Sequence, residues 1–81
     1  MKCIICGNKG EGHHVLTQKA YPELREKKFN IMGLCRQHHS EWHNSTMMDM
    51  IGHYFAVKVW FQNNGWTYCD VKKKFVPPSY S

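Results

Sequence analysis

Two short pairs of metal-ligating residues, far apart in the chain, constrain the fold more than any other feature. Cys3 and Cys6 are separated by two residues, as are Cys35 and His38, and 28 residues lie between the two pairs. Zinc ribbons and treble clefs close one tetrahedral site from two such pairs. A chain of 81 residues also buries too little surface to dispense with a staple of this kind. The spacing therefore predicts a structural Zn²⁺ ion on Cys3, Cys6, Cys35 and His38.

Four cysteines could instead form two disulfides in a secreted protein. The Cys-x2-Cys spacing beside six histidines favours a metal site in a reducing compartment. No apolar segment follows the first residues as in a signal peptide, and no apolar run is long enough to span a bilayer. We therefore expect a cytoplasmic protein without a membrane partner. Eleven Lys and Arg against six Asp and Glu give a formal charge of +5, which favours a polyanion such as nucleic acid.

Local patterns predict a small α+β fold in one domain. Residues 13–17 and 29–34 are short runs of β-forming and apolar character, and Gly33 predicts a turn in the second run. Residues 35–44 lack Pro and Gly and have a helical pattern. The second chelating pair therefore lies at the start of a helix, where residues three apart share a face.

A second helix is predicted from Met47 to about Asn63. Thr46 and Asp49 resemble an N-cap with an acidic third residue, and apolar residues then recur at steps of three and four. Residues 66–69 predict either a brief strand or an extended tail packed on that helix. Lys72, Lys73 and Lys74 follow as a basic run.

The remaining histidines allow two interpretations. Five of the six lie between residues 13 and 43. His39 and His43 are four apart on the predicted helix and share a face about 100° from His38. His13 and His14 lie inside the loop that zinc would close, so they can fold back onto this helix. They are either surface or packing residues, or part of a second metal site.

The order of these residues resembles the HNH endonucleases, which share the ββα-metal fold. The His-His pair and the His-x3-His ending are similar to the nuclease domains of DNase colicins, and the small size resembles phage and prophage HNH proteins. The resemblance covers about half of the chain, and it is carried by Cys3, Cys6, His13, His14, Asn30, Cys35, His38, His39 and His43.

The resemblance implies a single HNH domain over residues 1–81, with a zinc-bound ββα core at 3–45 and an added C-terminal helix and basic tail at 46–81. It implies that His14 is a general base and that Asn30 tethers the loop that orients it. A catalytic divalent ion, which would be Mn²⁺, Ni²⁺, Zn²⁺, Co²⁺ or Mg²⁺, would be held by His13, His39 and His43.

These features predict a metal-dependent DNA endonuclease that nicks phosphodiester bonds with little sequence specificity. Phosphate contacts are expected from Lys27, Lys28, Lys72, Lys73 and Lys74, although a solvated tail is an equal reading of the last three. The alternative is a catalytically silent treble-clef module that binds DNA or a protein partner. A third reading is a nuclease subunit that works only within a phage packaging or recombination assembly.

Overall fold

Two short strands, β1 (Glu11–His14) and β2 (Ile31–Leu34), form the first sheet. β2 lies within the predicted run 29–34, whereas β1 overlaps the predicted run 13–17 only at His13 and His14, because the chain bends at residues 15 and 16. The computed structural model, which describes residues 1–78, pairs them antiparallel with His13 opposite Met32. Because side chains alternate between the faces of a strand, His13 is buried and its neighbour His14 is only half-buried. β1 ends at His14, so the backbone is free to turn there.

Gly33 lies inside β2, opposite Gly12, and the turn predicted at Gly33 is therefore wrong. The N-terminal segment crosses β2 at this point. The Gly33 carbonyl accepts a hydrogen bond from the Ile4 N–H at 3.0 Å, and a Cβ atom on residue 33 would collide with the Lys2 carbonyl oxygen. Glycine is needed here for a close backbone approach rather than for a change of direction.

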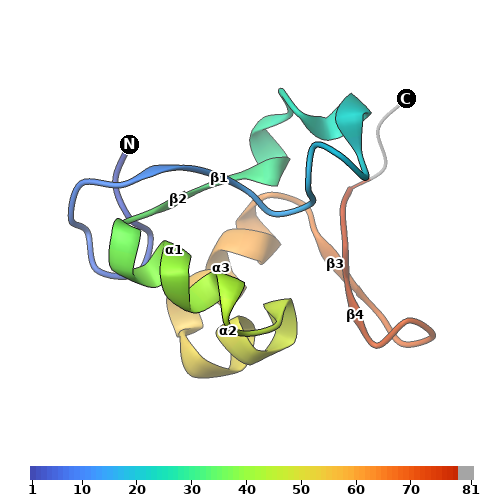
Figure 1. Cartoon of the computed structure of the whole chain (residues 1–81). Helices are drawn as coiled ribbons and strands as arrows, with labels where there is room; N and C mark the ends of the chain where they lie inside the picture. The colour runs from blue at the N-terminus through green and yellow to red at the C-terminus, as the bar shows by residue number, and fades with distance from the viewer. Residues whose placement is uncertain (79–81) are drawn as a thin grey trace.

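The first helix, α1 (Arg36–His43), confirms the helical pattern and follows β2 directly. Figure 1 shows α1 below the two strands. The second helix, α2 (Met47–His53), begins with the predicted capping box: Thr46 Oγ1 accepts from the Asp49 N–H at 3.1 Å, and Asp49 Oδ2 accepts from the Thr46 N–H at 3.3 Å. The reciprocal bonds satisfy two backbone donors that a helix start leaves open.

The single helix predicted over residues 47–63 is wrong, because Tyr54 divides it into α2 and α3 (Phe55–Asn63). Tyr54 has an extended backbone, with φ −128° and ψ 112°. Its hydroxyl donates to Glu41 Oε1 on α1 at 2.6 Å. This tertiary contact, at a residue that follows Gly52 closely, outweighs the weak local preference to continue the helix.

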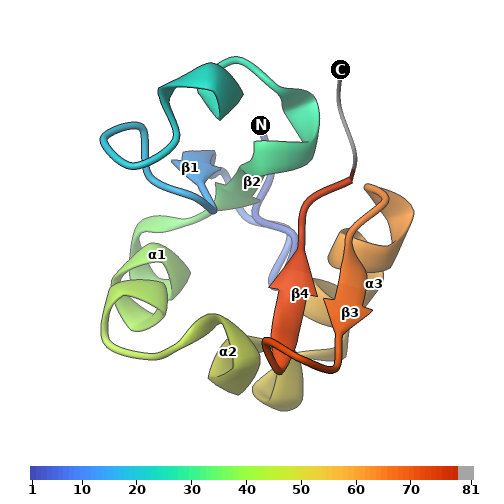
Figure 2. The ribbon, with the colours of Figure 1, turned by 90° about the vertical axis from the view of Figure 1, so that its right-hand side faces the viewer.

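The C-terminal part forms a hairpin of β3 (Thr67–Cys69) and β4 (Lys74–Val76), which faces the viewer in Figure 2. The strand alternative for residues 66–69 is therefore confirmed. The lysine run 72–74 lies in the hairpin turn and the first position of β4, so the predicted basic tail is wrong for these residues. Residues 79–81 of that predicted tail lie outside the described residues.

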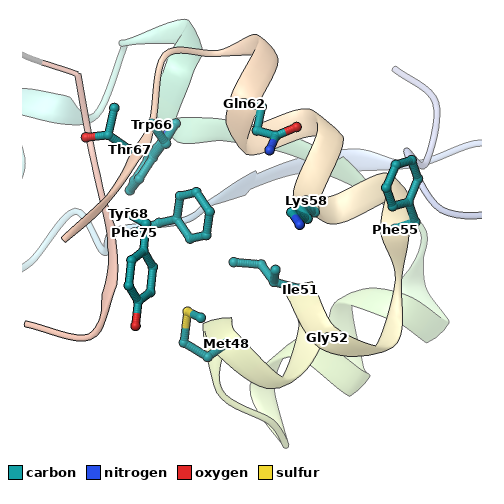
Figure 3. A pocket seen from close by; sticks show the side chains of 10 residues that line it. All are labelled: Met48, Ile51, Gly52, Phe55, Lys58, Gln62, Trp66, Thr67, Tyr68 and Phe75. Atoms are coloured by element: carbon teal, nitrogen blue, oxygen red, sulfur yellow. The ribbon is translucent and has the colours of Figure 1, made fainter. Parts of the chain in front are cut away.

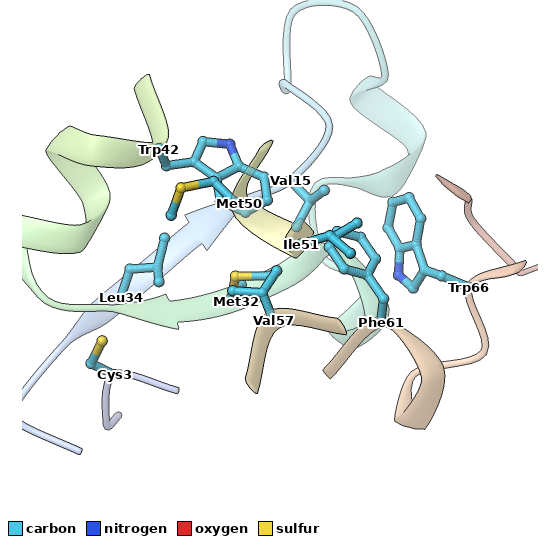
Figure 4. Packing of buried hydrophobic residues seen from close by; sticks show 10 residues of the cluster. All are labelled: Cys3, Val15, Met32, Leu34, Trp42, Met50, Ile51, Val57, Phe61 and Trp66. Atoms are coloured by element: carbon cyan, nitrogen blue, oxygen red, sulfur yellow. The ribbon is translucent and has the colours of Figure 1, made fainter. Parts of the chain in front are cut away.

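One apolar core connects β2 and the three helices, as Figure 4 shows, and Phe75 of the hairpin packs against it. Trp66 contributes through its ring and its indole N–H, which donates to the Phe29 carbonyl at 2.6 Å. Within residues 1–78, no helix has the length and apolar character needed to cross a membrane. The buried members of the core are Cys3, Val15, Met32, Leu34, Trp42, Met50, Ile51, Val57, Phe61 and Trp66.

Candidate metal centres

The predicted zinc ligands converge on one point. Their ligand atoms all lie within 4.8 Å of one another. His38 Nδ1 is 3.5 Å from Cys3 Sγ and 3.2 Å from Cys35 Sγ, and the sulfurs of Cys6 and Cys35 are 3.8 Å apart. A tetrahedral zinc ion would separate two sulfurs by about 3.8 Å and a sulfur and a nitrogen by about 3.6 Å. The three distances lie within about 0.4 Å of these values, so the cluster has a size suited to a zinc ion.

Local backbone structure brings the two halves of this cluster together. Residues 3–8 form a tight turn in which the Gly7 N–H donates to the Cys3 carbonyl and the Cys3 N–H donates to the Asn8 carbonyl. Gly7 has φ +78°, a conformation that favours glycine. On the other side, Cys35 is the N-cap of α1, and His38 lies one turn into that helix. The turn and the helix start therefore meet across the cluster.

The electrostatics of the cluster call for a cation. Burial raises the pKa of the Cys3 thiol, but hydrogen bonds from the backbone N–H groups of Cys35, Cys6 and Ile5 outweigh it and lower the pKa to about 6. The pKa of Cys6 is raised instead, because burial and the neighbouring Cys3 and Cys35 sulfurs outweigh a hydrogen bond from the Asn8 backbone. Cys3 therefore loses its proton readily, and the negative charge on its sulfur opposes the loss of a proton from Cys6. A divalent ion removes that repulsion, so the donor set fits zinc.

A second cluster of three imidazoles forms where another face of α1, which carries His39 and His43, meets His13 of β1. The ligand nitrogens of His13, His39 and His43 also lie within 4.8 Å of one another. His39 Nε2 and His43 Nε2 are 3.0 Å apart, and the His13 ring centroid is 4.7 Å from that of His39. Two imidazole nitrogens bound to one ion at about 2.0–2.1 Å stand about 3.0–3.4 Å apart. The histidine spacing therefore suits a shared metal ion.

His13 carries the clearest sign of a missing ligand partner. Its Nε2 atom is buried and has no hydrogen-bond partner among the described residues. Burial, followed by the neighbouring imidazoles of His39, His43 and His14, lowers the pKa of His13 to about 4. The ring is thus neutral at physiological pH and has a lone pair available. A buried polar atom without a partner costs free energy, which a bound metal ion would recover.

His14 lies beside this cluster in the same hollow. The hollow has a volume of about 400 Å³, and both His13 and His14 line it. Because β1 ends at His14, adjacent side chains reach one space although a regular strand would direct them apart. His14 Nε2 is 2.9 Å from the Arg25 carbonyl oxygen, which only accepts, so Nε2 carries the hydrogen. Nδ1 then has the free lone pair, and the Gln18 amide nitrogen lies 3.4 Å from it.

Asn30 is fully buried and ties together the loop that carries Arg25. Its Oδ1 accepts from the Leu16 N–H at 2.7 Å, and its Nδ2 donates to the carbonyls of Leu16 at 3.0 Å and Leu24 at 3.3 Å. The Asn30 carbonyl also accepts from the Val15 N–H at 2.9 Å. These bonds hold the segment that follows His14 and the segment that leads to Arg25.

The lysines expected at the site lie in two exposed groups. Lys27 and Lys28 lie at the start of the short 3-10 turn that precedes β2 (Lys28–Asn30). Lys27 lines a hollow that Glu23 and Glu26 also line. Lys72 and Lys74 line a different hollow beside β4 and the turn that precedes it. The structure adds two groups that the sequence reasoning missed, the Gln18 amide and the Arg25 carbonyl. The carbonyl has no signal in the sequence, because every residue has one.

Comparison with known proteins gives no relative for this arrangement. No protein-family model matches the sequence, and no curated protein or solved structure matches it at a significant level. The fold is thus a small α+β structure whose Cys3His cluster is suited to a metal ion.

Proposed function

We propose that this chain is a metal-dependent DNA endonuclease of the HNH type, which nicks phosphodiester bonds with low sequence specificity. One observation carries the proposal: three imidazoles with metal-ligand spacing share a hollow with a fourth imidazole that is oriented by a backbone carbonyl. Zinc at the Cys cluster is sufficient to staple the fold. A second set of convergent histidines, one of them buried without a partner, has no purpose in folding alone.

The proposed chemistry depends on which ring nitrogen of His14 can accept a proton. His14 would accept a proton from the attacking water at Nδ1, because Nε2 donates to the Arg25 carbonyl. Imidazole suits this role near neutral pH. The water oxygen then bonds to phosphorus as the bond from phosphorus to the 3′-oxygen breaks, which leaves a 5′-phosphate. The departing 3′-oxygen takes a proton from solvent and becomes a 3′-hydroxyl. An ion on His13, His39 and His43 would supply the positive charge that stabilises the leaving oxygen.

Gln18 and Asn30 would support His14 in different ways. The Gln18 amide, 3.4 Å from Nδ1, is exposed and must move aside when water binds there. Asn30 is buried and holds Leu16 and Leu24 on the segments that lead from His14 and toward Arg25. Geometry of this kind sets the tautomer and the direction of a general base, and small displacements lower its rate.

DNA is the expected substrate because the chain is basic. A formal charge of +5 attracts a phosphate backbone without reading its sequence. A chain of 81 residues has little surface left for base readout, so specificity would come from a partner protein, such as one in a phage packaging or recombination assembly. Lys27, Lys28 and the 72–74 run are exposed and available for phosphate contacts.

The second candidate is a silent zinc module that binds DNA or a protein. It is favoured by the separation of the two clusters, since the Cys3His set accounts for the fold without the other histidines. The two candidates differ in one respect, which is turnover. A silent module would bind without cutting and would tolerate loss of His14.

Metal analysis paired with plasmid nicking tests the proposal. Purified protein should keep about one zinc ion after mild chelation, take up a second divalent ion reversibly, and nick supercoiled plasmid only with both. His14→Ala should lower the nicking rate by about 10²–10⁴-fold while zinc content is unchanged. His53→Ala is the matched control, because His53 is exposed and lies outside both clusters. Equal rates for His14→Ala and wild type would contradict the proposal.

A further inference from the structure

A second hollow lies next to the histidine hollow. The segment after β1 forms one of its walls, and the β3–β4 hairpin forms the other. Its volume is about 180 Å³. Among residues 1–78, its lining includes two lysines and no acidic residue. Its lining residues are Leu16, Tyr21, Met47, Lys72, Lys74, Phe75, Val76 and Pro77.

This hollow has a fixed position relative to His14. Leu16 lines it, whereas Val15 and Thr17 line the histidine hollow, so the two hollows lie on either side of one three-residue segment. Two residues span at most about 7 Å of backbone, which places Leu16 within that distance of His14. The Leu16 N–H and carbonyl are both bonded to the buried Asn30 side chain. The arrangement is therefore built into the fold.

The lining combines three kinds of group that together recognise a nucleotide. Tyr21 is 40% exposed, and aromatic rings stack on nucleobases. Leu16, Met47 and Pro77 supply an apolar wall. Lys72 and Lys74 add two ammonium groups, which attract phosphates. An acidic peptide would also be attracted by the lysines, but it would leave the tyrosine ring without a flat partner.

We propose that this hollow, here called the base pocket, receives an unpaired nucleobase of the DNA strand whose phosphate lies at His14, and that Lys72 and Lys74 hold the adjacent phosphate. The inference rests on the proposed endonuclease function and specifies its substrate. Inside a duplex, the faces of a base are covered by its neighbours, so stacking on Tyr21 requires a base that has left the stack or was never paired. Strands with an unpaired segment at the cut are therefore the preferred substrate.

Binding separates this inference from catalysis. We would measure the affinity of zinc-loaded protein, without a second metal ion, for a short single-stranded oligonucleotide and for the duplex of the same sequence. The single strand should bind more tightly. Tyr21→Ala should weaken single-strand binding by roughly 5- to 100-fold and leave duplex binding almost unchanged. Tyr21→Phe should bind like wild type, because it keeps the ring.

The chain supplies matched controls in another hollow. Phe55, 77% exposed, and Lys58 line an apolar hollow of about 750 Å³ between α2, α3 and β3, shown in Figure 3. Phe55→Ala should leave single-strand affinity unchanged. Lys72→Gln should reduce the slope of log affinity against log salt by about 0.7, the value for one phosphate contact on a single strand, whereas Lys58→Gln should not.

The outcomes distinguish the two levels of the hypothesis. Equal affinity for single strand and duplex, with no effect of Tyr21→Ala, overturns the base pocket and leaves the endonuclease proposal standing if plasmid is still nicked. Absence of both DNA binding and nicking removes the endonuclease proposal and this inference with it. Zinc content and circular dichroism of each variant confirm that it is folded, which is expected because Tyr21 is a surface residue.

Discussion

Replacing Asn30 with alanine should lower the free energy of unfolding by about 3–5 kcal/mol. The Asn30 side chain is fully buried and makes three hydrogen bonds, to the Leu16 N–H, the Leu16 carbonyl and the Leu24 carbonyl. Alanine removes all three bonds and leaves their partners without a replacement. The Asn30 side chain thus joins the segment after β1 to the first 3-10 turn (Pro22–Leu24).

The magnitude follows from these bonds. Each net hydrogen bond contributes about 0.5–1.5 kcal/mol, so the three bonds contribute about 1.5–4.5 kcal/mol, and leaving the part-buried Leu16 N–H without a partner adds to the loss. A chain of 81 residues has a total stability of about 4–12 kcal/mol, so the loss is a large fraction of it. Asn30→Asp should also be destabilising, because it keeps an acceptor for the Leu16 N–H but turns a carboxylate oxygen toward two carbonyls.

Urea unfolding of the zinc-loaded protein, followed by circular dichroism, measures this loss. The control is Asn44→Ala, since Asn44 is exposed and its side chain makes one hydrogen bond, from Nδ2 to the Ser40 carbonyl at 2.9 Å. The control should lose less than about 1 kcal/mol. If Asn30→Ala loses no more than Asn44→Ala, the Asn30 side chain does not hold the loop, and the reasoning is refuted.

Three further predictions concern the metal centres and pH. Cys35→Ala should lose zinc and unfold, as shown by metal analysis and circular dichroism, because zinc contributes roughly 10 kcal/mol or more to such modules. His39→Ala should stay folded and keep zinc, and calorimetry should detect no second ion. With its second site empty, the wild type should lose about 2 kcal/mol of stability between pH 7 and pH 5, relative to His13→Gln. The sign follows from the pKa of His13, about 4 when folded and 6.5 unfolded: below pH 6.5 the unfolded chain binds a proton that the folded chain does not. If the difference in stability between wild type and His13→Gln is the same at pH 7 and pH 5, this prediction is contradicted.

The features that sequence predicted correctly are those set by local spacing. Cys3 with Cys6 and Cys35 with His38 are short pairs, and a tetrahedral ion leaves them few arrangements. The capping box of α2 is equally local, because Thr46 and Asp49 bond to each other's backbone. In these cases the residues that determine the structure lie within one turn of each other.

The features that sequence did not predict depend on distant contacts. The break at Tyr54 accompanies a hydrogen bond to Glu41, thirteen residues earlier. Glycine is common in turns, so Gly33 predicted one, but in the structure the N-terminal segment crosses β2 at Gly33. No residue near Gly33 in the sequence indicates that crossing. The base pocket joins Tyr21 to the hairpin lysines, which lie some fifty residues later and were read as a tail.

The two candidate metal centres share one short helix, and this makes the proposed second site depend on the first. Helix α1 has eight residues, too few for stability alone, so packing and an ion at the Cys cluster would hold it in place. Through that ion, Cys35 and His38 would tie the first turn of α1 to the tight turn at residues 3–8, while His39 and His43 meet His13 from β1 on another face. Loss of zinc would release α1 and separate His39 and His43 from His13. Loss of the second ion would leave the Cys cluster intact, because none of its ligands takes part in the histidine cluster. The dependence therefore runs in one direction, from the structural ion to the site proposed for catalysis.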